Sequence, residues 1–483
     1  MYGASQEVIE AYKADGVHKE FRVVIGNTSY GNEYIVDSSF NLKQSILDQE
    51  NFEAIGCIAS SLTVELRAQF STKVRDKKIT VYVQAGNTTE LQIFTGYISK
   101  CTKTANGWNR SIEAYDYFYM MSGQGGMADE NEKKQYDVTD WYNEHDEVRI
   151  GTLLNQVCSK FGLSVREGNK PLVNGTTLTK CGKEKKASSL SALDLIKYIM
   201  QVNGCFGYIT GDGYFSWKYL LMPSYDETGW LYPSAYLYPS PDLYPGQDSS
   251  HAQSIENAKN FIGEYDTLQY QDFKMLPINM VKVRDYEGDE KEGYYRKPGA
   301  GVSSADNIYI IQGNPLIQGE EKSKKEDIAK NVFDVLNSTW YVPFEATLPG
   351  LPYLECGDEV NFYDFVGDQG TASLQRFYIL TRTISGGQHL TDSWSANGNE
   401  YQHEFVTGTA SDPGLKDELE QEIDEKIAEA TGLFNIVSVP SYADIPDPPN
   451  TGTLYCVQGE VVTVSDLQDD EEPTGPTNES EGE

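Results

Sequence analysis

An alternation of apolar and polar residues with a period of two is the feature that most restricts the fold of this chain. In residues 60–70, Leu62, Val64 and Leu66 share one side of an extended segment, and polar residues take the other side. This pattern is typical of a strand with one face in a core. Similar segments, rich in β-branched and aromatic residues, occupy positions 21–26, 79–86, 91–103, 111–121, 278–286, 307–313, 358–365, 376–385 and 391–398.

The period changes to that of a helix within residues 122–222. Apolar residues recur three and four positions apart in 150–161 and in 190–200, and Ser188 and Ser189 are candidate caps of the second helix. Two strands and a tight turn are expected after these helices. The same reasoning places this hairpin at 205–220, with its turn at Gly211, Asp212 and Gly213, and predicts one more helix at 324–337.

The expected fold class is α+β, mostly β, with two similar small antiparallel β-barrel or β-sandwich domains flanking a small α+β module. The similarity lies between residues 97–117 and 378–401, because each begins with Tyr-Ile, passes a glycine turn and returns to a Tyr. A true internal repeat and a chance match of two hairpins both remain open. The expected parts are an N-terminal arm (1–17), the first β-domain (18–121), the α+β module (122–222), a Tyr/Pro-rich connector (223–259), the second β-domain with one helix (260–411), a C-terminal helix (412–434), a short strand-turn-strand unit (435–465) and a disordered acidic tail (466–483).

Charge is unevenly distributed along the chain. The 483 residues carry a formal net charge of −34. Half of this charge, −17, belongs to residues 412–483, where 19 acidic residues accompany two lysines. Because nucleic-acid binding depends on clustered Lys and Arg, no stable binding to a nucleic acid is expected, whereas a passage through which DNA slides is compatible with this charge.

The cellular compartment is constrained by apolar runs and cysteines. No stretch has the roughly 18 successive apolar residues of a membrane helix, and residues 1–16 lack the basic start and apolar run of a signal peptide. We therefore expect neither membrane insertion nor export. Seven widely spaced cysteines without a C-x-x-C pair indicate reduced thiols in a protein assembled in the cytosol.

Sequence patterns that carry catalysis or hold a cofactor are missing. The five histidines do not pair at metal-ligand spacing, and neither a nucleophile elbow nor a phosphate-binding loop is present. Asp285, Glu287, Asp289 and Glu290 resemble half of a calcium loop, but the residues that follow do not complete it, which favours a solvated acidic hairpin tip. We predict no enzyme, no cofactor and no metal.

A helix with one narrow apolar seam is predicted at 412–434. The seam is compatible with a self-associating bundle at a subunit interface, and equally with packing of the helix on the chain's own body. Its residues are Leu415, Leu419, Ile423, Ile427 and Ala430.

Turn residues within 260–405 carry a resemblance to a known family. Asn314 and Pro315 precede the predicted helix 324–337, and two close turns and a pair of strands follow it. This arrangement resembles the last domain of phage tail hub proteins, which are the baseplate hub of contractile tails and the tail-tip or tail-associated protein of long-tailed phages. The first β-domain is similar to that family's first β-domain. The motif residues are Asn314, Pro315, Gly350, Pro352, Glu355, Gly357 and Asp358.

The resemblance implies a homotrimer in the virion tail, assembled in the host cytoplasm. In that family, two related β-domains per chain imitate a six-membered ring. The ring docks onto the tail tube or the distal tail ring and carries a spike or fibre, and the tape-measure protein and DNA pass through its channel. This chain lacks the long C-terminal lytic or receptor-binding domain of many members, so the implied function is a structural symmetry adapter.

Two other functions remain open at the level of sequence. A carbohydrate-binding phage adhesin would use the aromatic residues of the repeated Leu-Tyr-Pro motif, namely Tyr232, Tyr238 and Tyr244. A tail-associated peptidoglycan hydrolase would need an acidic pair that spacing along the chain cannot identify, because its geometry is three-dimensional.

Overall fold

The protein is described by a computed structural model, in which two compact units lie at 1–414 and 415–483. Among the helices of the described residues, none is long and apolar enough to cross a membrane. The structure describes residues 4–14, 16–46, 57–70, 73–104, 108–122, 136–145, 147–180, 190–220, 260–275, 277–296, 307–337, 341–366, 371–386, 389–398, 404–407, 435–439, 453–457 and 460–461.

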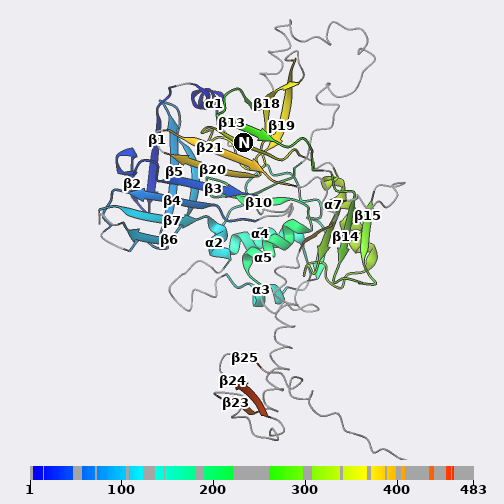
Figure 1. The fold of residues 1–483 in the computed structure, drawn as a ribbon. Helices are drawn as coiled ribbons and strands as arrows, with labels where there is room; N and C mark the ends of the chain where they lie inside the picture. The colour runs from blue at the N-terminus through cyan, green and yellow to red at the C-terminus, as the bar shows by residue number, and fades with distance from the viewer. Residues whose placement is uncertain are drawn as a thin grey trace, which may run out of the picture. The chain divides into compact units, whose positions relative to one another are not determined.

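The first unit is built on one sheet of eleven strands, all paired antiparallel (Figure 1). Strands of the two predicted β-domains share this sheet, because β20 pairs with β3 across more than 300 residues of sequence. In order across the sheet, the strands are β13 (Thr267–Tyr270), β17 (Phe344–Pro349), β21 (Thr391–Ala396), β20 (Thr381–Gly386), β3 (Phe40–Ser45), β4 (Ser61–Leu66), β7 (Arg110–Tyr115), β6 (Leu91–Lys103), β5 (Lys78–Ala85), β1 (Lys19–Ile25) and β2 (Thr28–Tyr30).

Smaller sheets surround this large one. They are β12 (Phe261–Ile262), β18 (Glu359–Val366) and β19 (Thr371–Tyr378); β15 (Gly293–Arg296), β14 (Met280–Arg284), β16 (Ile308–Gln312) and β22 (Glu404–Thr407); the hairpin β10 (Phe206–Ile209) and β11 (Phe215–Lys218); and β8 (Glu147–Arg149) with β9 (Leu178–Lys180).

Helices pack against these sheets. In Figure 1, α4 and α5 lie beside each other, and α7 lies against β14 and β15. The helices are α1 (Gln6–Lys13), α2 (Tyr117–Met121), α3 (Thr139–Asn143), α4 (Ile150–Lys160), α5 (Ala192–Gln201) and α7 (Lys322–Leu336), with a short 3-10 turn η1 (Asn32–Tyr34).

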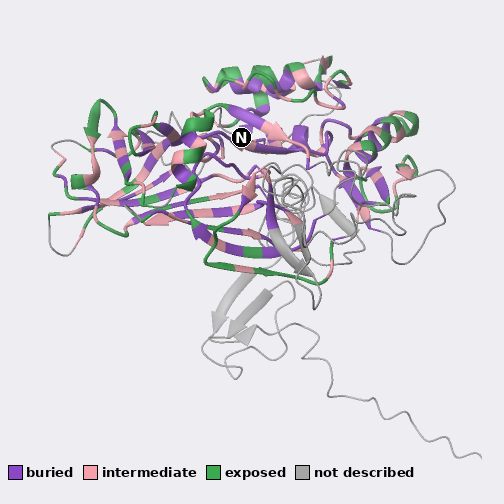
Figure 2. Ribbon diagram, turned by 90° about the horizontal axis from the view of Figure 1, so that it is seen from above, coloured by how far each residue is buried: buried purple, intermediate pink, exposed green. Residues whose placement is uncertain are grey.

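The core follows from the period-two patterns. In β4, Leu62, Val64 and Leu66 are at most 1% exposed, and the residues between them are intermediate or exposed. Buried residues alternate with less buried ones along the strands of the large sheet in Figure 2. Since each such strand places every second side chain in an apolar interior, the alternation itself selects which face is buried.

Strand order repeats between the two halves of the first unit. The first half has β3, β4, β7, β6 and β5 as successive neighbours. The second half has β13, β17, β21 and β20 as successive neighbours, and β19, which leads directly into β20, pairs with β18. The consecutive strands β19 and β20 thus occupy together the place of the single long strand β6.

The repeat also holds residue by residue. Leu62 of β4 pairs with Ala114 of β7, and Phe344 of β17 pairs with Ala396 of β21. Leu62 and Phe344 therefore correspond. In both strands, this residue and every second residue after it are buried. This agreement in order, direction and register supports an internal repeat over a chance match of two hairpins.

The prediction of a mostly β, α+β fold is confirmed, and β6 has the bounds expected from sequence. Three details of the prediction are wrong, namely the end of one strand, the cap of one helix and the continuity of the strand at 376–385. The strand predicted at 111–121 ends at Tyr115, because Asp116 caps helix α2 and accepts a hydrogen bond from the Phe118 N–H. The cap of α5 is Ser191 rather than Ser188 or Ser189.

The strand predicted at 376–385 is divided into β19 and β20, because these two pair with different neighbours. The predicted arm at 1–17 contains helix α1, whose Val8 and Tyr12 are buried. The predicted division into domains remains a proposal.

The second unit is described only by its strands. Strand β23 (Asn435–Val439) pairs parallel with β24 (Thr453–Val457), and β24 pairs antiparallel with β25 (Glu460–Val461). The predicted helix at 412–434, with Leu415 and the rest of its seam, and the predicted acidic tail at 466–483 lie outside the described residues.

Asp116 predicts a pH dependence of stability. Its carboxylate is 1% exposed and accepts hydrogen bonds from the N–H groups of Ser60 and Phe118, yet burial raises its pKa to about 7. The unfolded pKa is about 3.9, so the folded chain retains a proton between these values that the unfolded chain has released. The free energy of unfolding therefore falls, by up to about 1.4 kcal/mol per pH unit, as pH rises through this window.

Denaturant unfolding of wild type and Asp116→Asn at several pH values between about 4 and 8 checks this contribution. We expect the variant to lose part of the decline in stability, since its amide does not titrate. The matched control is Asp327→Asn, at an exposed position on α7. Equal slopes for wild type and Asp116→Asn would contradict the assignment.

Candidate functional site

The predicted motif residues lie at the junction of the β-rich and helical parts of the first unit. Asn314 is 1% exposed, and its side-chain amide donates to the Tyr198 carbonyl at 2.9 Å and to Gln201 Oε1 at 3.1 Å. Its Oδ1 accepts from the Leu316 N–H at 3.0 Å, across Pro315. This turn therefore fixes the end of β16 to helix α5.

The other motif residues form the connection between β17 and β18. The Gly350 N–H donates to the Leu390 carbonyl at 2.8 Å, and a side chain at Gly350 would collide with Leu390. Pro352 follows in the same loop and lines a small cavity. The close approach of Gly350 to Leu390 explains why glycine stands at this position.

An arginine that was not identified from the sequence reaches into this loop from strand β20. Arg382 of β20 is 1% exposed and donates from Nε to Asp392 Oδ1 at 2.9 Å. It also donates to the carbonyls of Leu351, at 2.8 Å, and Leu354. Burial opposes its charge, but Asp392 outweighs burial and raises the pKa of the guanidinium. Arg382 therefore stays charged, and it joins Asp392 of β21 to the carbonyl groups of the loop.

A partly buried lysine, 18% exposed, joins the loop to the hairpin β10–β11. Lys218 Nζ lies 3.0 Å from Asp358 Oδ1, 3.4 Å from Glu355 Oε2 and 2.9 Å from the Cys356 carbonyl. Burial lowers the pKa of Lys218, but Asp358 and Glu355 outweigh it, so the net shift is upward. Burial raises the pKa of Asp358, but Lys218 outweighs burial, so the net shift is downward.

Arg166 adds a second cation to the same cluster, with NH1 3.6 Å from Glu355 Oε1. Motif residues Glu355 and Asp358 thus provide the acidic half of an ion-pair cluster whose basic half, Arg166 and Lys218, comes from the α+β part. Lys218 and Asp358 are 18% and 11% exposed, so removing one partner leaves the other as a largely desolvated charge without its counter-ion.

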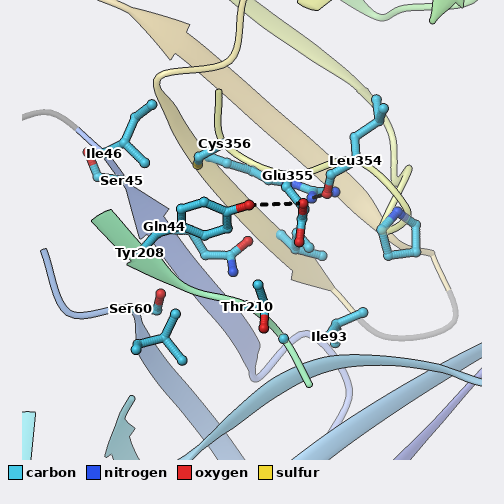
Figure 3. A pocket seen from close by; sticks show the side chains of 15 residues that line it. Gln44, Ser45, Ile46, Ser60, Ile93, Tyr208, Thr210, Leu354, Glu355 and Cys356 are labelled. Atoms are coloured by element: carbon cyan, nitrogen blue, oxygen red, sulfur yellow. Dashed lines mark hydrogen bonds between the residues drawn. The ribbon is translucent and has the colours of Figure 1, made fainter. Parts of the chain in front are cut away.

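A cavity of about 20 Å³ lies between strand β3, strand β10 and the loop that connects β17 to β18. In Figure 3, Gln44 of β3 lies beside Tyr208 of β10, and the Tyr208 hydroxyl points toward Glu355 of the loop, 3.5 Å from its Oε2. This volume suits about one water molecule. The charged groups of the site contact one another across the boundary between the loop and the α+β part. This is the geometry of a structural junction.

The motif turn recurs in the first half of the chain. The Gly357 N–H donates to the Ile379 carbonyl at 2.6 Å, and the Ile379 N–H donates to the Asp358 carbonyl at 3.1 Å. In the same way, the Asp76 N–H donates to the Ile98 carbonyl at 2.7 Å, and the Ile98 N–H donates to the carbonyl of residue 77 at 3.1 Å. Gly357 and Asp76 both have positive φ, of 80° and 67°.

This repeated turn has a consequence for strand pairing. In the second half, the turn ends the pairing of β18 with β19 before Ile379, and β20 then takes β3 as its neighbour. In the first half, the turn ends the pairing of β5 with β6 before Ile98. Within the described residues, positions 99–103 of β6 pair with β7 alone.

The acidic turn that resembled half of a calcium loop is neutralised by a lysine. Lys325 of α7 is fully buried, with Nζ 2.8 Å from Asp285 Oδ1 and 2.6 Å from Asp289 Oδ2. The prediction of a solvated tip is wrong for these two carboxylates, because the ammonium lies between them. Among the described residues, no group of three His, Cys, Asp or Glu is arranged to hold a metal ion.

The described cysteines are free, and the tyrosines of the alternative adhesin function are not among the described residues. Cys57, Cys101, Cys158, Cys205 and Cys356 are free thiols, and burial raises the pKa of Cys57, Cys158 and Cys356 to about 12. Such thiols are poor nucleophiles at neutral pH. Tyr232, Tyr238 and Tyr244, together with the rest of the predicted connector, lie outside the described residues.

The repeated turn predicts that a substitution at Gly357 lowers stability and that a glycine at its counterpart, Asp76, does not. At Gly357, a Cβ would lie 2.8 Å from Lys218 Cδ, and φ is 80°. We expect Gly357→Ala to lower the free energy of unfolding by about 1–2 kcal/mol. The matched change Asp76→Gly places glycine in the same conformation, and we expect it to change stability by less than about 0.5 kcal/mol. Denaturant unfolding measures both, and equal destabilisation would contradict the equivalence of the turns.

No protein-family profile and no curated protein sequence matches this chain. Solved structures similar to it include the 43 kDa tail protein of prophage MuSo2 from Shewanella oneidensis, at 9% identity and a TM-score of 0.43, covering 78% of this chain and 97% of that chain. A tail protein from Neisseria meningitidis MC58 is similar at 8% identity and a TM-score of 0.42, covering 78% and 96%.

The prophage tail protein gp18 from Listeria monocytogenes EGD-e is similar at 12% identity and a TM-score of 0.38, covering 83% of this chain and 99% of that chain. All three of these solved structures are tail proteins. The likeness is one of fold, and it assigns no role to any residue.

Proposed function

We propose that this chain is a structural hub of a phage tail or baseplate, and that three copies form a ring of six related β-units. The observation that carries the proposal is the repeat of five strands within one chain, together with the edge-to-edge pairing of β20 with β3. The two repeats are joined head to tail, because β20 and β3 occupy non-equivalent positions in their respective repeats.

Head-to-tail association has only two outcomes. If each step rotates by a fixed angle that closes, the units form a ring; otherwise they form an open filament. A ring of three chains contains six units. That number matches the six-fold tail tube or distal tail ring that the sequence resemblance implies as the docking partner, so a trimer resolves the mismatch between three chains and six tube subunits.

The chemistry of the described site fits a structural role. Its charged residues are engaged with one another, since Lys218 contacts Asp358 and Glu355 while Arg382 contacts Asp392. We propose that these pairs fix the angle between the repeats and the α+β part, so that the ring keeps its shape when a spike or fibre below transmits force. In this proposal the tape-measure protein and DNA pass through the channel without stable binding.

The acidic balance of the chain supports a non-adhesive passage. DNA is retained by proteins through clustered Lys and Arg, whereas this chain carries a net charge of −34. Half of this charge lies in residues 412–483, and the remaining −17 gives the rest of the chain no excess of cations with which to retain DNA.

The mass of the full-length chain in solution tests the proposal. A trimer of 54.0 kDa chains has a mass of about 162 kDa. We expect sedimentation equilibrium to give this mass, and we expect the trimer to co-sediment with purified distal tail or tail-tube rings from the same particle. A monomer at every concentration that also leaves the rings unbound would contradict the hub proposal.

A further inference from the structure

We infer that residues 99–103 of β6 in one chain pair antiparallel with β13 and residues 271–273 of a second copy, in the register that joins β20 to β3 within a chain. The inference deepens the proposed function and rests on it, because it specifies the contact by which three copies would associate. Its occupant is a second copy of this chain.

The first step is the equivalence of strands. Ile98 and Ile379 form the same two backbone hydrogen bonds to the repeated turn, so residues 99–103 correspond to 380–384. Strand β13 corresponds to β3, because Tyr270 pairs with Phe344 of β17 and Leu42 pairs with Leu62 of β4. Each chain therefore presents one strand of each kind that forms the internal joint.

The second step transfers the register. Within the chain, Thr383 pairs with Lys43 and Ile384 pairs with Leu42. Residue 383 corresponds to Thr102, and residue 43 corresponds to Gln271. The internal joint therefore places Thr102 of one chain opposite Gln271 of the next, and it places Lys103 opposite Tyr270.

Backbone polarity at the edge of β13 agrees with this register. The Ile46 N–H donates to the Leu380 carbonyl across the internal joint, so even-numbered residues of β3 direct their N–H groups to β20. The Gln271 N–H donates to the carbonyl of Pro343, the residue before β17. By the same alternation, even-numbered residues of β13 direct their N–H groups away from β17, toward the strand that the inference places there.

Exposure differs between the internal joint and its counterparts. Ile384 and Leu42, which pair across the joint, are 1% and 0% exposed. Their counterparts Lys103 and Tyr270 are both exposed, and Tyr270 is 42% exposed. A second copy would bury these counterparts as the internal joint buries Ile384 and Leu42.

Charge is complementary across the inferred contact. Lys103 pairs with Arg110 on the neighbouring strand β7, which places two cations side by side. In the transferred register, exposed Asp272 of the second copy lies opposite Cys101, on the same face as Lys103. A carboxylate at this place offsets the repulsion between the two cations.

A pair of engineered cysteines tests the register. Thr102 and Gln271 would form a non-hydrogen-bonded antiparallel pair, whose Cα atoms lie about 4.5 Å apart and suit a disulfide. We expect full-length Thr102→Cys/Gln271→Cys, made with Cys101→Ser to remove the neighbouring native thiol, to form intermolecular disulfides on mild oxidation. The cross-linked products on a non-reducing gel should end at three chains.

Two matched variants serve as controls. Lys43→Cys/Thr383→Cys occupies the same register within one chain, so it should form an intramolecular disulfide and verify the oxidation conditions. Thr102→Cys/Gln269→Cys shifts the register by two residues and should cross-link far less. Both carry Cys101→Ser, and native mass measurement establishes that each variant assembles as the wild type does.

The outcomes separate this inference from the hub proposal. Cross-linking that ends at three chains supports both. Products that continue beyond three chains support the edge contact and overturn the trimer. A trimer that fails to cross-link while the internal control closes overturns the edge contact and leaves the hub proposal standing. Equal cross-linking of the shifted pair also overturns the inferred register.

Discussion

An edge strand presents a row of backbone N–H and C=O groups that another strand completes, and the arrangement of this molecule depends on how it satisfies one such row. The edge of strand β20 is completed by β3, which lies more than 300 residues earlier in the sequence. This pairing merges two strand repeats into one sheet of eleven strands and fixes the direction in which the repeats follow each other. A head-to-tail joint within one chain supplies the geometry for a joint between chains, which is the basis of the proposed ring.

The repeated turn keeps this edge available, and ion pairs hold the adjoining loop. The turn at Gly357, and its counterpart at Asp76, directs the chain away so that β18 and β5 stop pairing before Ile379 and Ile98. Arg382 and Lys218 then hold the loop of the second repeat against the rest of the unit. A buried ion pair adds little net stability over apolar packing but defines one geometry, which is what a part shared among several copies requires.

The sequence predicted the elements that obey a local rule. Strand β6 and the helices α4, α5 and α7 follow from their periods, and Gly350 and Gly357 were identified by turn chemistry. Strands β13 and β17 were missed, because their pairing is set by partners distant in sequence. The partners of the motif residues were missed for the same reason, although Arg382 shares a face with buried Ile384, and a charge on an apolar face is a signal of a buried ion pair. Sequence alone left the internal repeat undecided, since the hairpins share few residues, and strand order and register provided the evidence for it.

The central claim is that two repeats in each chain act as near-equivalent units of one ring. The most direct test is a cryo-EM reconstruction of the assembled protein, computed without imposed symmetry. The account predicts three chains in a closed ring, with six β-units related by successive rotations of about 60° and with the joint between chains resembling that between β20 and β3. A ring in which the two repeats of a chain face different directions, or in which chains meet through other surfaces, would contradict it.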